Sequence, residues 1–267
     1  MEYIEGVLIA LGINMIAVTG VSLLLAFTGI FTFGHAAYMA IGAYTSALCM
    51  MRLHFPFPLA LASAAVVAAL CSIPVGYPTL RLTSDYFIVA SLGVGEIVVL
   101  LVENFHMITG GARGLPGVPF KTTLLNTWII AFVCIWMARN FINSKYGRSC
   151  VAIRENELAG QCIGIDTFKA KLTVFMISAA MGGVAGALLG HYVGILHPKM
   201  FGFVRSEELG IAAILGGVGS LTGSLMAVGI VTVLPEVLRF TAEWRLVIYG
   251  LAVVLVIIFR PQGLLGF

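Results

Sequence analysis

The sequence predicts an all-α, polytopic transmembrane helical bundle of about eight or nine helical segments. Of the 267 residues, 60% are hydrophobic and only 10% are charged, whereas a soluble domain carries roughly 25% charged residues. A soluble enzyme and a disordered protein are therefore excluded. Because the apolar stretches are continuous and lack the alternating polarity of barrel strands, the spans are expected to be helices. Four stretches contain no Asp, Glu, Lys or Arg, and each is longer than the roughly 20 residues that one span needs: Gly6–Met51, Leu53–Leu80, Leu172–Pro198 and Leu209–Pro235.

Breaks within these stretches divide them into helices. The segment Thr28–Gly34 holds two glycines and two threonines, which predicts a bend of a kind that a membrane tolerates only inside protein. The stretch Leu209–Pro235 forms either one span or two half-helices broken at Gly216–Gly219, and the broken form is preferred. The expected apolar segments, in chain order, are Val7–Phe27, His35–Met51, Leu59–Tyr77, Tyr86–Val102, Thr127–Phe141, Leu172–Ile195, Leu209–Pro235 and Leu246–Phe259. Residues 1–267 are expected to form a single transmembrane domain.

The basic residues predict how the chain is oriented. Six of the 15 Lys and Arg residues fall within residues 139–171, and cytoplasmic loops carry such an excess. The loop of residues 142–171 is therefore expected in the cytoplasm and the glycine-rich loop Thr109–Gly117 outside. With the broken form of Leu209–Pro235, Arg260 is also expected inside.

The loop of residues 142–171 is expected to contain an amphipathic helix that Gly164 ends. One face of this helix is apolar, with Val151, Leu158 and Cys162, and the opposite face is polar, with Arg154, Glu155, Glu157 and Gln161. Such a helix either lies on the membrane surface or docks on a cytoplasmic partner.

Three features inside the spans are candidates for packing or for a pathway. Glycines recur every four residues, which lets another helix approach closely, at Gly182, Gly186, Gly190 and Gly194. Glu96 lies in an apolar span, where a carboxylate costs about 2.5–3.5 kcal/mol on insertion scales. Its role on a pathway and its role as a structural hydrogen-bonding group are both open. His35 follows the bend at Gly34, where a capping or packing role is expected.

The sequence offers no catalytic or metal-binding motif. It contains no GxxxxGK[ST], HExxH or GxSxG pattern and no Cys/His cluster with zinc spacing. The five cysteines are scattered and are expected to be small buried hydrophobic residues. We therefore expect no enzyme activity, no metal and no cofactor bound by this chain.

Several segments of the sequence resemble those of a known family. The segment Arg154–Ile165 is similar to the coupling loop of permease subunits in ABC importers, and its departures from the general pattern are typical of the branched-chain amino acid permeases. Three further segments resemble signatures of that same family: Phe33–Tyr44, Thr79–Glu96 and Thr109–Leu115. Gly216–Gly223 and Arg260–Gly266 resemble its late motifs. The first-span pattern and the TGG loop favour the LivM-type permease over its H-type paralogue.

The resemblance implies roles for individual residues. Coupling to an ATPase would fall to Arg154, Glu155, Glu157, Leu158, Ala159, Gly160 and Gly164. The translocation path or its gating would involve Gly34, His35, Tyr86, Glu96, Thr109, Gly110, Gly111, Gly114, Gly216, Gly217 and Gly219. Ser84-Asp85 replaces the Arg-Gly pair that is usual before Tyr86, which leaves the substrate open.

The resemblance also implies partners and a location. The chain would be a multi-pass protein of the bacterial inner membrane, paired with a paralogous permease and served by an extracytoplasmic substrate-binding protein. Two cytoplasmic ATPase subunits would bind ATP and Mg. The substrate would be a branched-chain amino acid. Two alternatives stay open: a relative that moves urea or short amides, and a secondary transporter that uses Glu96 or His35 as a proton site.

Overall fold

The structure is a computed structural model that describes residues 2–82, 84–217, 219–237 and 250. Its helices, in chain order, are α1 (Glu2–Thr28), α2 (His35–Leu53), α3 (Phe57–Thr79), α4 (Ser84–Asn104), α5 (His106–Thr109), α6 (Leu124–Asn143), α7 (Lys145–Glu155), α8 (Glu157–Cys162), α9 (Thr167–Val193), α10 (Phe203–Gly216) and α11 (Leu221–Val237). Two short 3₁₀ helices, η1 (Gly111–Arg113) and η2 (Pro198–Phe201), and two strands, β1 (Leu115–Pro116) and β2 (Ile195–Leu196), complete the described part.

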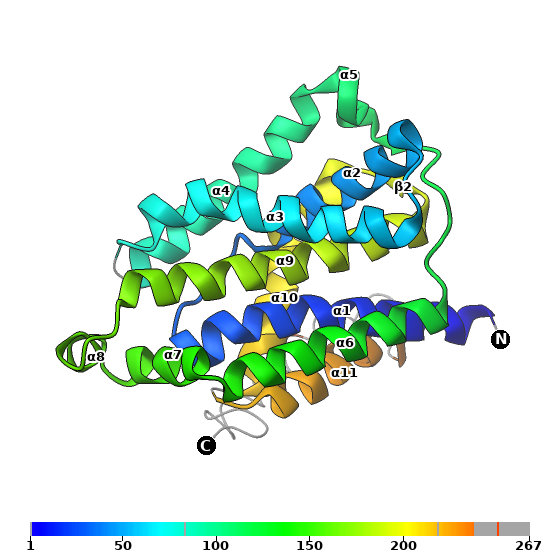
Figure 1. The fold of residues 1–267 in the computed structure, drawn as a ribbon. Helices are drawn as coiled ribbons and strands as arrows, with labels where there is room; N and C mark the ends of the chain where they lie inside the picture. Colours follow the sequence, from blue (N-terminus) through cyan, green and yellow to red (C-terminus); the bar gives the residue numbers. More distant parts are fainter. Residues whose placement is uncertain (1, 83, 218, 238–249, 251–267) are drawn as a thin grey trace.

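The described residues confirm an all-α polytopic bundle (Figure 1). Five helices, α1, α3, α4, α6 and α9, are long and apolar enough to cross a membrane. Helix α9 lies in the middle and packs against α1, α2 and α3. The expected apolar run Leu246–Phe259, the motif Arg260–Gly266 and the side of the C-terminus lie outside the described residues.

The predicted bend between the first two helices is confirmed, because residues 29–34 are not helical. Side chains satisfy the backbone donors that the break exposes. Phe33 N donates to Ser91 Oγ of α4 at 3.0 Å, and Ala36 N donates to Ser206 Oγ of α10 at 3.0 Å. Non-helical backbone at membrane depth needs such partners inside the protein. The bend therefore ties α4 and α10 to the start of α2.

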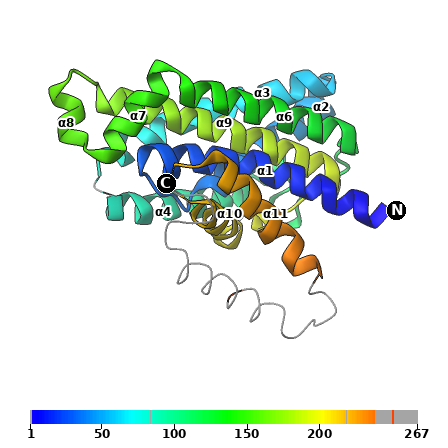
Figure 2. The same ribbon diagram turned by 90° about the horizontal axis from the view of Figure 1, so that it is seen from below.

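The break at the glycines of Leu209–Pro235 is confirmed as well. Helix α10 ends at Gly216, and α11 begins at Leu221. A Cβ on Gly216 would overlap the backbone of Ser224, so the two helices meet closely at the turn. Helix α10 crosses the long helices steeply and is seen nearly end-on in Figure 2. The second half-helix then runs back beside α1.

The two ends of the bundle differ in structure. Helices α7 and α8 lie at one end, together with the C-terminal end of α1 (Figure 1). At the opposite end, β1 and β2 pair antiparallel, with Leu115 opposite Leu196. Tyr44 Oη donates to the carbonyl of Leu196 at 3.1 Å and ties this small sheet to α2. We call these the α7–α8 end and the sheet end.

Candidate functional site

The amphipathic segment forms two helices, which corrects the expectation of one. Helix α7 stops at Glu155, and Asn156 adopts an extended conformation with φ −160° and ψ 109°. The side chain of Asn156 then accepts a hydrogen bond from Ala159 N at 3.1 Å and caps α8. Asn favours N-cap positions because its short side chain reaches the free N–H groups of a first helical turn. The chain therefore turns a corner at Asn156.

The corner separates the residues that were expected to form one apolar stripe. Val151 of α7 is partly buried against the core, whereas Leu158 of α8 is 73% exposed. Cys162 is also exposed. The buried residues of α7 are Gly147, Cys150 and Ile153. Helix α7 thus packs on the bundle, and α8 presents an apolar tip that nothing in the described residues covers.

The helix ends are fixed by caps and one ion pair. Gly164 has φ +85° and follows the end of α8, a conformation that glycine adopts without strain. Asp166 caps α9 by accepting from Lys169 N at 3.0 Å, and this hydrogen bond lowers the pKa of the Asp166 carboxyl. Lys171 Nζ lies 2.7 Å from Glu157 Oε1 and joins the start of α9 to α8. Gly160 is buried on the inner side of α8.

Arg154 connects the α7–α8 segment to the long apolar helices. Its Nη1 donates to the carbonyl of Ala26, in the last turn of α1, at 2.6 Å. Carbonyls in a last helical turn lack partners within the helix, and a guanidinium satisfies them well. The Arg154 side chain also lies against Gly29, and a Cβ on Gly219 would lie 3.2 Å from Nη1. One residue of α7 therefore reaches α1, the bend that follows α1, and the turn between α10 and α11.

His35 lies in the middle of the bundle and is fully buried. Ser178 Oγ of α9 donates to the carbonyl of Gly20 at 2.7 Å, and His35 Nδ1 lies 3.4 Å from the same Oγ. Because the Ser178 hydroxyl hydrogen is committed to Gly20, the imidazole is the donor in this contact. A Cβ on Gly20 or Gly182 would come within 3.4 Å of the ring. The residue is a packing centre between α1, α2 and α9, as expected from its place after Gly34.

The glycine series of α9 packs closely against its neighbours. A Cβ on Gly186 would overlap the backbone of Met39, and one on Gly190 would lie 3.0 Å from the Leu196 side chain. Gly194 is also closely packed, because a Cβ there would overlap the Phe120 ring. It lies just beyond α9 with φ +78° and ends the helix.

Two of the predicted pathway residues lie on the outside of the chain. Glu96 is exposed on α4. Among the described residues, no hydrogen bond or ion pair reaches its carboxylate. Tyr86, also on α4, is 70% exposed. The outer face of α4 thus carries a carboxyl group and an aromatic side chain.

The TGG loop forms part of the sheet end. Thr109 is buried, its Oγ1 donates to the carbonyl of Val102 at 2.6 Å, and it accepts from Gly111 N at 3.2 Å. The glycines of this loop have positive φ, at Gly110, Gly111 and Gly114. A Cβ on Gly114 would lie 2.5 Å from the carbonyl of Leu196. These residues shape a tight cover over the end of α9, far from α7 and α8 (Figure 1).

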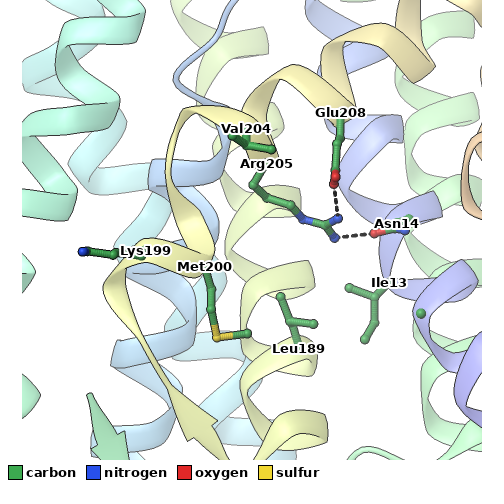
Figure 3. Close-up of a pocket in the computed structure, with 9 residues that line it drawn as sticks. Ile13, Asn14, Leu189, Lys199, Met200, Val204, Arg205 and Glu208 are labelled. Atoms are coloured by element: carbon green, nitrogen blue, oxygen red, sulfur yellow. Dashed lines mark hydrogen bonds and ion pairs between the residues drawn. The ribbon is translucent and has the colours of Figure 1, made fainter. Parts of the chain in front are cut away.

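The structure adds a polar cluster that sequence reasoning missed. An open pocket of about 420 Å³ lies between α1, α9, η2 and α10. Figure 3 shows Arg205 at one side of this pocket, between Glu208 and Asn14. Its Nη1 lies 3.0 Å from Glu208 Oε2, and its Nη2 donates to Asn14 Oδ1 at 2.5 Å. The signal in the sequence is two polar groups in apolar helices, Asn14 in α1 and the Arg205–Glu208 pair in α10.

Sequence comparison places this chain among transport proteins. A family model described as the permease component of the branched-chain amino acid transport system matches residues 3–258. The high-affinity branched-chain amino acid transport system permease protein LivM of Escherichia coli K12 is 31% identical over 292 aligned positions, which cover 96% of this chain and 67% of the relative. The corresponding LivH protein of the same organism is 27% identical over 297 positions, which cover 99% of this chain and 94% of LivH. A probable LivM protein of Methanocaldococcus jannaschii is 25% identical over 213 positions, covering 70% of this chain and 62% of that relative. No solved structure matches the chain.

Proposed function

This chain belongs to the family of branched-chain amino acid transport permeases and is of the LivM type, and from that premise we propose that it is one permease subunit of an ATP-driven importer of branched-chain amino acids. The chain acts as a single transmembrane domain in a bacterial inner membrane. It pairs with a paralogous permease and receives substrate from an extracytoplasmic binding protein. Two ATPase subunits bind ATP and Mg on the cytoplasmic side, where residues 142–171 lie.

The exposed tip of α8 is the observation that carries this proposal. Leu158 is 73% exposed and Ile163 is 74% exposed on a segment with fixed caps at both ends. Apolar side chains that are exposed beside the turn at Asn156 are suited to insert into a groove of a partner protein. A helix that lay along a membrane surface would instead bury a continuous apolar face. The turn at Asn156 interrupts any such face.

Arg154 gives the proposed docking site a mechanical connection to the bundle. A partner that moves α8 also moves α7, and the Arg154–Ala26 hydrogen bond of 2.6 Å joins α7 to α1. The same side chain lies beside Gly29 in the bend and Gly219 in the α10–α11 turn. Alternating access needs an element whose equilibrium both the ATPases and the substrate can shift.

Reconstitution tests this proposal directly. The chain, its paralogous permease and the ATPases are reconstituted in liposomes, and the binding protein is added to the solution that contains the substrate. Uptake of labelled leucine, valine, isoleucine, urea and acetamide is then compared. ATP-dependent uptake of the three amino acids that survives a protonophore is the expected result. Uptake that collapses with the proton gradient would make the chain a secondary transporter. Uptake of urea or acetamide in place of amino acids would reject the substrate class.

A further inference from the structure

The Arg205 pocket lies at membrane depth. On the facing helices α1 and α9, Gly6 lies against Tyr192 and Gly20 lies against Ser178. Halfway between these contacts, Ile13 and Asn14 are level with Ala185, which is five residues from the middle of α9 (Thr167–Val193). That offset is roughly 8 Å along the helix, well within the roughly 15 Å half-thickness of the hydrocarbon core. The Arg205–Glu208 pair therefore sits where lipid would penalise its charges.

A charged pair at this depth needs an aqueous cavity or a protein surface beside it. The Arg205 and Glu208 side chains are 20% and 50% exposed, so the described part of the chain does not enclose them. The pocket they line is open and has a volume of about 420 Å³, which is in the range of small-molecule sites. Lys199 also lines the pocket, but its ammonium points away from the guanidinium (Figure 3).

The polar groups of the pocket are held in place and have unused capacity. Asn14 accepts from Arg205 and donates its Nδ2 to Thr232 Oγ1 of α11 at 3.1 Å, so three helices fix its amide. Nη1 and Nη2 of Arg205 each make one of the contacts described, so each keeps a second N–H donor, whereas Nε is buried. A guanidinium offers five N–H donors, and a carboxylate fits two of them side by side. Only one oxygen of Glu208 pairs with Arg205, which leaves the other free to accept from an ammonium group.

The remaining wall of the pocket is apolar. Ile13, Leu189 and Met200 lie beside the guanidinium, and Val204 lies on the other side (Figure 3). A ligand that matches the whole pocket carries a carboxylate for Arg205 and an ammonium for Glu208. It also carries a branched aliphatic group that packs on the apolar wall. Urea and short amides carry no charge for Arg205 and no aliphatic group for the wall.

We propose that the pocket formed by Arg205, Glu208, Asn14 and their apolar neighbours is a binding site of the permease itself for an aliphatic α-amino acid in its zwitterionic form. Arg205 binds the α-carboxylate, Glu208 binds the α-ammonium, and Asn14 positions Arg205. This inference rests on the proposed function and adds the site within the membrane at which the permease recognises its substrate.

Protection of a cysteine tests the pocket without the binding protein. Val204→Cys is introduced into the permease–ATPase complex in nanodiscs, and its alkylation is followed by peptide mass spectrometry. With a Kd of about 1 mM, about 10 mM leucine leaves roughly a tenth of the sites free and slows alkylation about tenfold.

Two probes keep the isobutyl group of leucine, and each lacks one of its two charges: 4-methylpentanoate and 3-methylbutylamine. Both are expected to protect weakly. Leu125→Cys on α6 is the matched control, because Leu125 is 65% exposed and Val204 is 67% exposed.

Substitutions separate recognition from folding. Arg205→Met is expected to abolish protection by leucine while Val204→Cys and Leu125→Cys still react at their unprotected rates. Arg205→Lys keeps the charge and is expected to retain weaker protection. Equal protection by leucine and 4-methylpentanoate, protection by urea, or no protection by leucine would each overturn the proposal. Failure of the proposed function would be measured in a separate experiment, in which the reconstituted wild-type importer shows no ATP-dependent leucine uptake.

Discussion

Gly42 of α2 and Gly183 of α9 meet backbone against backbone, and a Cβ on Gly42 would overlap the main chain of Gly183. Close approach of this kind needs small residues on both helices. It brings α2 against the middle of α9, where Met39 and Gly186 make a second close contact. The contact fixes the position of the bend that precedes α2, and with it His35.

Replacing Gly42 by Leu is expected to separate α2 from α9. Overpacking a tight contact costs about 1–3 kcal/mol, which lowers the melting temperature of a protein of this size by roughly 2–4 °C per kcal/mol. Thermal unfolding of the purified permease in detergent measures the change. Gly93→Ala in α4 is the control, because a Cβ there meets nothing within 4 Å. An unchanged melting temperature for Gly42→Leu would contradict the close contact.

Arg154→Met is expected to loosen α7 from α1. The Arg154 side chain is 22% exposed, and a hydrogen bond from a charged group contributes about 1.5–3 kcal/mol. Hydrogen exchange should therefore become faster both in α7 and in the last turn of α1. Arg148→Met is the matched control on α7, since among the described residues the Arg148 side chain hydrogen-bonds Asn143 O of the preceding helix, at 3.3 Å, and no residue of α1. Equal exchange in the two variants would show that the Ala26 contact does not hold the helices together.

Leu158→Asp is expected to uncouple the ATPases from transport. Docking into a groove concentrates binding free energy on a few anchors, each worth about 2 kcal/mol or more, so substrate-stimulated ATP hydrolysis should fall at least about tenfold. Met107→Asp, at the sheet end and 94% exposed, should leave hydrolysis unchanged. Both variants should insert normally because neither side chain is buried. Normal coupling in Leu158→Asp would leave membrane-surface binding as the better account of α8.

The native cysteines of α7 and α8 are expected to react differently with maleimides. Burial raises the pKa of the Cys150 thiol to about 11, and only the thiolate is nucleophilic. Cys150 should therefore be nearly inert at neutral pH and gain reactivity as the pH rises toward 11. Cys162 is exposed and should react at neutral pH, from the cytoplasmic side only. Labelling of Cys162 from the outside of intact cells would reverse the proposed orientation.

Composition and spacing predicted the class of protein and most of its helices. Continuous uncharged runs can bury their backbone polar groups in lipid only as helices, so the all-α bundle followed from the sequence. The breaks at Thr28–Gly34 and at Gly216–Gly219 also followed, because glycines weaken a helix. The basic residues around 142–171 and the family resemblance marked the segment that forms α7 and α8.

The tertiary structure decided how these elements meet. A periodic pattern cannot show a corner at Asn156, because the same residues suit one helix or two, and the N-cap hydrogen bond to Ala159 selects two. Glu96 carries the same local signal as a buried carboxylate, yet packing left its face of α4 open. Asn14 and Arg205 are 191 residues apart, and only the crossing of α10 over α1 brings them together. Contacts between distant residues depend on the geometry of several helices at once, whereas each helix depends mainly on its own residues.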